Sequence, residues 1–175
     1  LPFSIPASSS LRGITANALT LKILWKAYFK VRKQSKVIMK ILGIEIKGND
    51  CIFMALEGDK TTFTLADFPK KTSLTDSYDS LLVRQFHAEL SELLCSHQVD
   101  GIVIKKRTEK GKFAGGAISF KMEGIIQLAF EKKVSFISGP QIKALIKSSP
   151  EITLPAINKY QEQAFYAAYT FLESK

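Results

Sequence analysis

The feature that most constrains this fold is an unbroken succession of short apolar runs that begins at Met39. The runs "KILGIEIK" and "DCIFMALEG" are rich in residues that favour strands, and Gly48-Asn49 between them suits a hairpin turn. A third run, "TTFTLADF", follows Gly58-Asp59. The sequence therefore predicts three antiparallel strands joined as a meander.

The pattern then changes to helices that alternate with strands. Thr75 and Asp76 offer an N-cap, and the apolar residues that recur every fourth position after them predict a helix to about His97. The next run, "IVI", is apolar on both faces, as a buried parallel strand requires. Four more elements follow: a helix over residues 117–132 with Phe120, Ile125, Leu128 and Ala129 facing inward, a strand at "VSFI", a helix that starts at Ser138-Gly139-Pro140, and a last helix over residues 155–172.

This order, βββαβαβα with an extra C-terminal helix, predicts an α/β fold with a central mixed sheet and helices on both faces. A chain of 175 residues with 46% hydrophobic content suits one domain with a real core. Every long apolar stretch is interrupted by Lys or Glu, so no membrane span is expected. Cys51 and Cys95 fit neither a disulfide framework nor a zinc site, which favours a reducing cytoplasm.

The net charge of +9 is unevenly distributed. Residues 1–38 hold seven bases and no acid, whereas the remaining 18 bases face 16 acids. The globular part is thus nearly neutral, and the basicity of the whole chain says little about what it binds. We expect this leader to lie outside a single domain at 39–175. It could be an arm that binds an anionic surface or nucleic acid, a targeting presequence, or translated sequence upstream of a true start at Met39.

The loop after "IVI" combines basic residues with glycines and leads directly into a helix. Its bases would supply charge, its glycines would let backbone N–H groups approach a ligand, and the helix N-terminus would add its dipole. The spacing is not that of a P-loop, because Gly115 is followed by Gly116 and Ala117. The loop is either a site for the phosphate of nucleic acid or a nucleotide, or a solvated turn. The candidate phosphate-binding residues are Lys105, Lys106, Arg107, Lys110, Gly111, Lys112, Gly115 and Gly116.

The element order, with a glycine-containing first strand that ends in an acid, resembles the ribonuclease H-like superfamily and, within it, resolvases of the RuvC kind. The resemblance covers residues 39–175. The stretch "KGKFAGGAISFKMEG" is also similar to the hallmark of a small family of uncharacterised bacterial proteins. Enzymes of the superfamily cut phosphodiesters with two metal ions, so the resemblance implies carboxylates from the first strand, the fourth strand and the last helix.

Glu45 matches the first of these carboxylates, and strand alternation places it on one face with Ile41 and Gly43. On the fourth strand the acid should fall at about Lys105 or Lys106. An ammonium there would repel a divalent cation. A lysine beside Glu45 could instead replace the cation and pair with the carboxylate.

The remaining acids match the implied pattern less well. Glu109 could substitute from the loop, and Glu123 could face the cleft from the helix that follows it. Glu162 points roughly 140° away from the inward stripe of the last helix. That stripe is expected to consist of Ile157, Tyr160, Ala164, Ala168 and Phe171, with Gln161 and Gln163 near its edges.

Two functions remain open on this sequence. The first is a ribonuclease H-like domain with a degenerate metal site that needs no cofactor and binds nucleic acid or another phosphate-bearing ligand. The alternative is an active nuclease dependent on Mg²⁺ or Mn²⁺, with Glu45 as a metal ligand and catalytic carboxylates from Glu45, Glu109 or Glu123, and Glu162. The near-neutral charge of the domain argues against a large DNA footprint.

Overall fold

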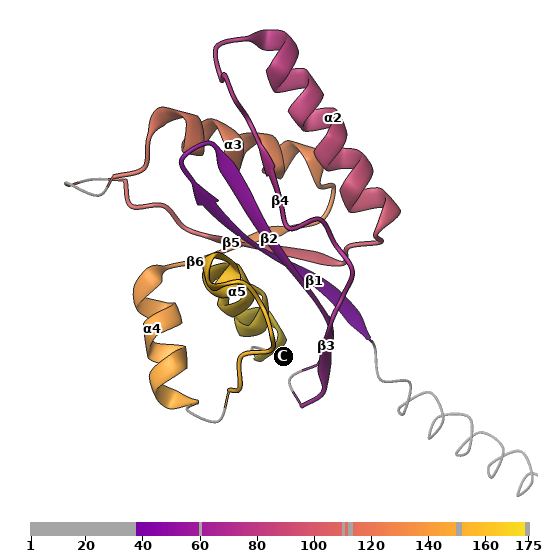
Figure 1. Ribbon diagram of the computed structural model, residues 1–175, viewed down its shortest axis with the longest axis vertical. Coiled ribbons are helices and arrows are strands. Elements are labelled where there is room, and N and C mark those ends of the chain that lie inside the picture. Colours follow the sequence, from indigo (N-terminus) through magenta and orange to yellow (C-terminus); the bar gives the residue numbers. More distant parts are fainter. Residues whose placement is uncertain (1–37, 60, 110, 112–113, 150–151, 174–175) are drawn as a thin grey trace, which may run out of the picture. The chain divides into compact units, whose positions relative to one another are not determined.

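The structure is a computed structural model that describes residues 38–59, 61–109, 111, 114–149 and 152–173 (Figure 1). The basic leader, apart from Ile38, lies outside these residues, and so do Lys110 and Lys112 of the candidate loop. Within the described part of the chain, no helix is long and apolar enough to cross a membrane.

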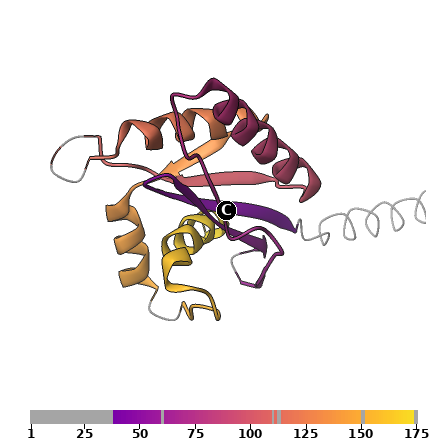
Figure 2. The same ribbon diagram turned by 45° about the horizontal axis from the view of Figure 1, so that its top comes forward.

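Six strands form one mixed sheet (Figures 1 and 2). β1 (Met39–Lys47) pairs antiparallel with β2 (Asp50–Gly58) and parallel with β5 (Gly101–Lys105), which in turn pairs parallel with β6 (Val134–Ile137). The hairpin turn between β1 and β2 contains Gly48 at φ 62°, a conformation that favours glycine. β3 (Phe63–Leu65) and β4 (Lys71–Ser73) both pair with β2. The expected α/β fold with a mixed sheet is confirmed.

Helices cover both faces of this sheet, as expected (Figure 2). α2 (Ser80–Ser96) and α3 (Ala117–Ala129) pack on one face. α4 (Gly139–Ser148) and α5 (Glu162–Glu173) pack on the other, with the short 3-10 helix η1 (Lys159–Gln161) directly before α5. The two faces therefore have separate apolar cores.

The first strand divides its side chains between these cores as its alternation predicts. Leu42, Ile44 and Ile46 are fully buried against the α2 and α3 side. Ile41 belongs to the core on the α5 side, and Glu45 shares that face. β1 therefore brings one carboxylate to the end of the sheet beneath α5.

The third strand is shorter than expected, and an additional strand follows it. The segment after β3 stays hydrogen-bonded to β2 as far as Ala66, whose N donates to Ala55 O. It then leaves β2 and pairs with it again at Lys70, whose carbonyl oxygen accepts from Phe53 N. Phe68 packs its ring edge-on against Phe53 in the interval, and Pro69 has no N–H to give to a ladder. The excursion divides the predicted run into β3 and β4.

Helix starts also differ from the expected ones. The N-cap of α2 is Asp79, whose carboxylate accepts from Leu81 N at 2.7 Å, whereas the Asp76 carboxylate accepts from Tyr78 N in a turn before the helix. The last helix begins as η1 at Lys159 rather than at Pro155. Because a 3-10 turn has three residues per turn, Tyr160 leaves the expected inward stripe and is 42% exposed.

The inward face of α3 was assigned incorrectly at two positions. Leu128 is 78% exposed and Phe120 is 37% exposed, whereas Ser119, Met122, Ile125 and Ile126 are buried. The helix also ends at Ala129, before the expected Lys132. The helix contains more apolar residues than one face can bury, so periodicity alone did not determine its orientation.

Gly43 supplies a testable constraint on this architecture. A Cβ at Gly43 would overlap the carbonyl oxygen of Ala164 and lie 2.7 Å from Ala168 N, so α5 can approach β1 only because this residue has no side chain. We expect Gly43→Ala to lower the free energy of unfolding by about 3 kcal/mol or more in urea denaturation, because the strand and the helix must separate.

Gly124→Ala is the matched control. Nothing lies within 4 Å of a Cβ at Gly124, and alanine is the better helix former, so we expect unchanged or slightly greater stability. Equal effects of the two substitutions would contradict the close-packing account.

Candidate functional site

The centre of the candidate site is an ion pair between two neighbouring strands. Gly43 and Ile44 of β1 pair in register with Val103 and Ile104 of β5, so the residues that follow them end side by side. Lys105 Nζ lies 2.7 Å from Glu45 Oε1. The exposed fraction is 23% for the lysine side chain and 12% for the glutamate side chain. A lysine thus pairs with Glu45 at the point where the resemblance implied a second carboxylate.

The next base along the chain is paired differently. Lys106 Nζ lies 2.9 Å from Glu109 Oε1, and both side chains are more than half exposed. The hydrogen bond that Lys106 donates to Glu109 and, next, the charge of Glu109 raise the pKa of Lys106 above its ordinary value. Exposed pairs of this kind contribute little stability, because solvent screens them and two long side chains must be held in one geometry. Lys106 can therefore change partners at small cost.

Arg107 anchors the loop to the sheet and to α3. Its Nη1 donates to Ile46 O at the end of β1 at 2.9 Å, and its backbone N donates to Glu123 Oε1 at 3.4 Å. Its Nε is buried and has no hydrogen-bond partner among the described residues. A Cβ at Gly115 would lie 3.3 Å from that Nε and 3.2 Å from Ser119 Oγ. The absence of a side chain at Gly115 therefore leaves room for the Arg107 side chain.

The loop returns to the helix through backbone hydrogen bonds. Gly115 N donates to Thr108 O, and Gly111 adopts φ 92°, where glycine is favoured. Gly116 is the N-cap of α3 and makes no side-chain capping hydrogen bond. The N-terminus of α3 therefore carries its partial positive charge without a side-chain acceptor from its own cap.

The acids implied by the resemblance are not brought together. Glu45 pairs with Lys105, Glu109 with Lys106, and Glu123 accepts from the backbone of Arg107. Glu162 is the first residue of α5. The pKa of Tyr166 is raised mainly by burial and, to a smaller extent, by the charge of Glu162. In the part of the chain that the structure describes, no three His, Cys, Asp or Glu side chains form a group that could hold a metal ion.

Gln161 has a structural role that the sequence did not reveal. It is 5% exposed, its Nε2 donates to Phe53 O at 3.0 Å, and its Oε1 accepts from Asn158 Nδ2 at 3.0 Å. The amide satisfies Phe53 O on the edge of β2 that faces away from β1, in the interval between β3 and β4 where no strand pairs with that edge. The sequence signal was the position of Gln161 near the edge of the expected inward stripe.

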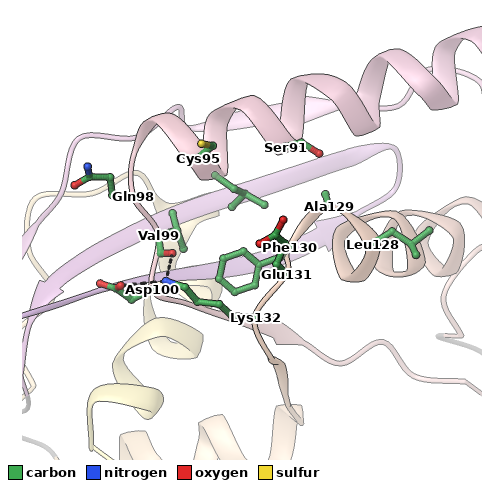
Figure 3. Close-up of a pocket in the computed structure, with 11 residues that line it drawn as sticks. Ser91, Cys95, Gln98, Val99, Asp100, Leu128, Ala129, Phe130, Glu131 and Lys132 are labelled. Atoms are coloured by element: carbon green, nitrogen blue, oxygen red, sulfur yellow. Dashed lines mark hydrogen bonds and ion pairs between the residues drawn. The ribbon is translucent and has the colours of Figure 1, made fainter. Parts of the chain in front are cut away.

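A cavity of about 570 Å³ lies elsewhere, between the C-terminal parts of α2 and α3 (Figure 3). Among the residues that line it, Lys132 Nζ donates hydrogen bonds of 3.2 Å to Val99 O and to Asp100 Oδ1. The backbone N–H of Lys40 and then the ammonium of Lys132 hold the pKa of Asp100 below its ordinary value. These residues lie at the start of β5, the opposite end from Lys105, so the cavity includes none of the candidate residues.

Comparison with known structures defines the class of this fold. Over 78% of its length the chain is similar to Thermus thermophilus RuvC, with a TM-score of 0.57 and 12% identity over 95% of that chain. It is similar to T. thermophilus RuvC in complex with Holliday junction substrate at a TM-score of 0.56, with 14% identity over 78% of this chain and 94% of that one. At these identities the likeness shows the fold alone, and that fold is ribonuclease H-like.

The sequence itself identifies the family. Residues 39–171 match the family described as "Protein of unknown function (DUF3010)", and the chain belongs to it. No curated protein matches the sequence. The matched region begins at Met39, where the apolar pattern of the sequence begins.

The ion pair at the centre of the site should be measurable. Lys105→Met would leave the largely buried Glu45 carboxylate without its partner, and we expect a loss of about 2 kcal/mol in the free energy of unfolding, between the values for exposed and buried pairs. The double variant Lys105→Met, Glu45→Gln should recover part of this loss. Lys106→Met, which removes the exposed pair, is the control and should change stability little. Equal losses from the two lysine variants would show that the central pair has no special strength.

Glu123 predicts a pH dependence. Burial raises the pKa of Glu123 above 4.5, and the charge of Glu109 acts in the same direction. The backbone hydrogen bond from Arg107 and the charges of Arg107 and Lys106 oppose this increase without cancelling it. A carboxyl whose folded pKa is raised contributes stability that is present at low pH and is lost as pH rises through the folded pKa. Glu123→Gln keeps the acceptor for Arg107 N and does not ionise.

We therefore expect the wild type to lose stability relative to Glu123→Gln as pH rises from 4 to 7, in urea denaturation at each pH. A difference between the two proteins that stays constant over this range would contradict the assignment.

Proposed function

We propose that this chain is a ribonuclease H-like domain whose metal site is degenerate and that it binds nucleic acid, or another phosphate-bearing ligand, without cutting it. The observation that carries the proposal is the 2.7 Å ion pair between Lys105 and Glu45. In this pair an ammonium occupies the position next to the first-strand carboxylate.

The residues present do not fit the two metal ions that the fold family implies. Mg²⁺ and Mn²⁺ prefer several oxygen ligands, and catalysis of phosphodiester cleavage needs both ions close together. Glu45 is already neutralised by Lys105, the charges of Glu109 and Glu123 both act on Lys106, and Glu162 lies at the start of α5. We therefore assign no catalytic step to these carboxylates.

The loop from Lys105 to Gly116 is the proposed phosphate-binding element. The ion pair between its exposed Lys106 and Glu109 is screened by solvent, and the N-terminus of α3 has no side-chain cap. The sequence adds Lys110 and Lys112 to the same loop. Because the domain outside the leader is nearly neutral, the proposed contact covers a few phosphates rather than a long duplex.

Domain extent and location complete the proposal. We assign residues 39–175 to the functional domain and treat the leader as separate, which agrees with the start of the family match at residue 39. The described cysteines form no disulfide, since Cys51 is buried and Cys95 is a free exposed thiol. A reducing cytoplasm suits both.

Oligonucleotide binding tests this function. We expect the protein to bind short fluorescein-labelled oligonucleotides in fluorescence anisotropy, with or without Mn²⁺, and to leave them uncut. Lys110→Ala, Lys112→Ala should weaken binding about tenfold and lower the slope of log affinity against log salt by about 1 to 2, because phosphate contacts release counterions.

Lys143→Ala, Lys147→Ala on α4 is the control, since it removes two exposed charges elsewhere and should have a smaller effect. Equal losses from the two double variants would leave the loop as a solvated turn. Cleavage that requires Mn²⁺ and disappears in Glu45→Ala would overturn the degenerate-site assignment in favour of a nuclease.

A further inference from the structure

Tyr78 is a highly exposed aromatic residue. It lies in the segment between β4 and α2, and 85% of its surface is exposed. Tyrosine rings usually bury much of their apolar surface, so a ring this exposed gains little from the fold that holds it. Its position therefore calls for an explanation outside the apolar core.

The ring is nevertheless held in place. Lys121 Nζ lies 4.0 Å from the centroid of the Tyr78 ring and donates to Ser77 O at 3.0 Å. Tyr78 N donates to Asp76 Oδ1 at 2.7 Å. One ammonium covers only part of one face of the ring, and the large exposed fraction leaves the opposite face open. A ring fixed in this way loses little conformational freedom when a flat partner stacks on it.

The charge of Lys121 is also available. Lys105 and Lys106 have carboxylate partners, and the Arg107 guanidinium is bound to Ile46 O. Lys121 makes contact with a carbonyl oxygen and an aromatic ring but has no carboxylate within ion-pair distance in the described residues. An anion near this ammonium would displace no acidic side chain.

Tyr78 and the proposed phosphate loop lie on opposite sides of one helix. Lys121 contacts the segment before α2, whereas Glu123, about 200° further around α3, contacts the start of the loop at Arg107. The two contacts are therefore separated by the width of the N-terminal half of α3, on the order of 10 Å. A nucleic-acid strand that crosses this helix end could reach both.

We propose that Tyr78 and Lys121 form a base-stacking subsite for single-stranded nucleic acid. An unpaired base stacks on the open face of Tyr78, and Lys121 attracts a neighbouring phosphate while it fixes the ring. Duplex DNA does not fit this subsite, because its bases are already stacked on each other. The inference rests on the proposed function and specifies which form of nucleic acid the domain prefers.

The test compares an octamer of thymidine with an octamer of abasic phosphodiester that has the same charge. Fluorescence anisotropy is measured on the full chain and on Tyr78→Ala, Tyr78→Phe and Lys121→Met. Stacking is worth roughly 1 to 3 kcal/mol for each base, so we expect the wild type to bind the thymidine octamer at least about fivefold more tightly than the abasic one. Tyr78→Ala should abolish this preference, Tyr78→Phe should retain it, and Lys121→Met should weaken binding of both octamers.

Tyr160→Ala on η1 is the control, because Tyr160 is the other exposed tyrosine among the described residues, at 42%. It should leave the preference intact. Equal binding of the two octamers by the wild type, or a preference that survives Tyr78→Ala, would reject the subsite while leaving phosphate binding in place. Absence of binding to either octamer would reject the proposed function and the subsite together.

Discussion

The close approach of α5 to β1 is the constraint on which the site depends. The backbone of Ala164 and Ala168 lies directly against Gly43, while Phe171, further along α5, lies near Gly101, the partner of Ile41. The helix therefore runs antiparallel to β1, with its N-terminal end towards the end of the strand. Glu45 lies on this covered face and keeps only 12% exposure. A carboxylate so deeply placed needs a partner, and Lys105 from the next strand provides it.

The three described basic residues of the loop, Lys105, Lys106 and Arg107, differ in how strongly their partners hold them. Lys105 is held by a largely buried carboxylate and Arg107 by a carbonyl of β1, so both are structural. Lys106 pairs with the exposed Glu109 and also interacts with the charge of Glu123, and an incoming phosphate would replace the Glu109 carboxylate with another anion. A binding site built in this way exchanges partners and is expected to give modest affinity.

The sequence predicted the parts of the fold that are set by local periodicity. Alternation in β1 correctly separated Leu42 and Ile44 from Ile41, because successive side chains of a strand point to opposite faces and each face has its own core. The sequence also offered a lysine at the end of β5 as one possible partner of Glu45. It could not show that Gln161 completes the edge of β2, because that contact joins positions far apart in the chain.

Orientation was harder to predict where several faces of a helix looked alike. The pattern of α3 predicted Phe120 and Leu128 on the inward face and did not include Met122, yet of these three only Met122 is buried. The Tyr78–Lys121 contact was not anticipated either, because it joins the end of a turn to a helix 43 positions later. Its local signal was the Asp76 turn that places Tyr78 just before α2.

The likeness to RuvC raises the question of whether this chain shares more with RuvC than the fold. Fold alone does not determine function, so the decision falls on charges at the ends of β1 and β5. At about 4 Å and an effective dielectric constant near 20, a divalent ion would gain about 8 kcal/mol from one carboxylate and lose about as much to one ammonium. With Lys105 beside Glu45 these terms cancel, and dehydration of the ion is left uncompensated. We therefore expect the ends of β1 and β5 not to bind a divalent cation, and we propose that the positive end of α3 and the loop beside it attract phosphate instead.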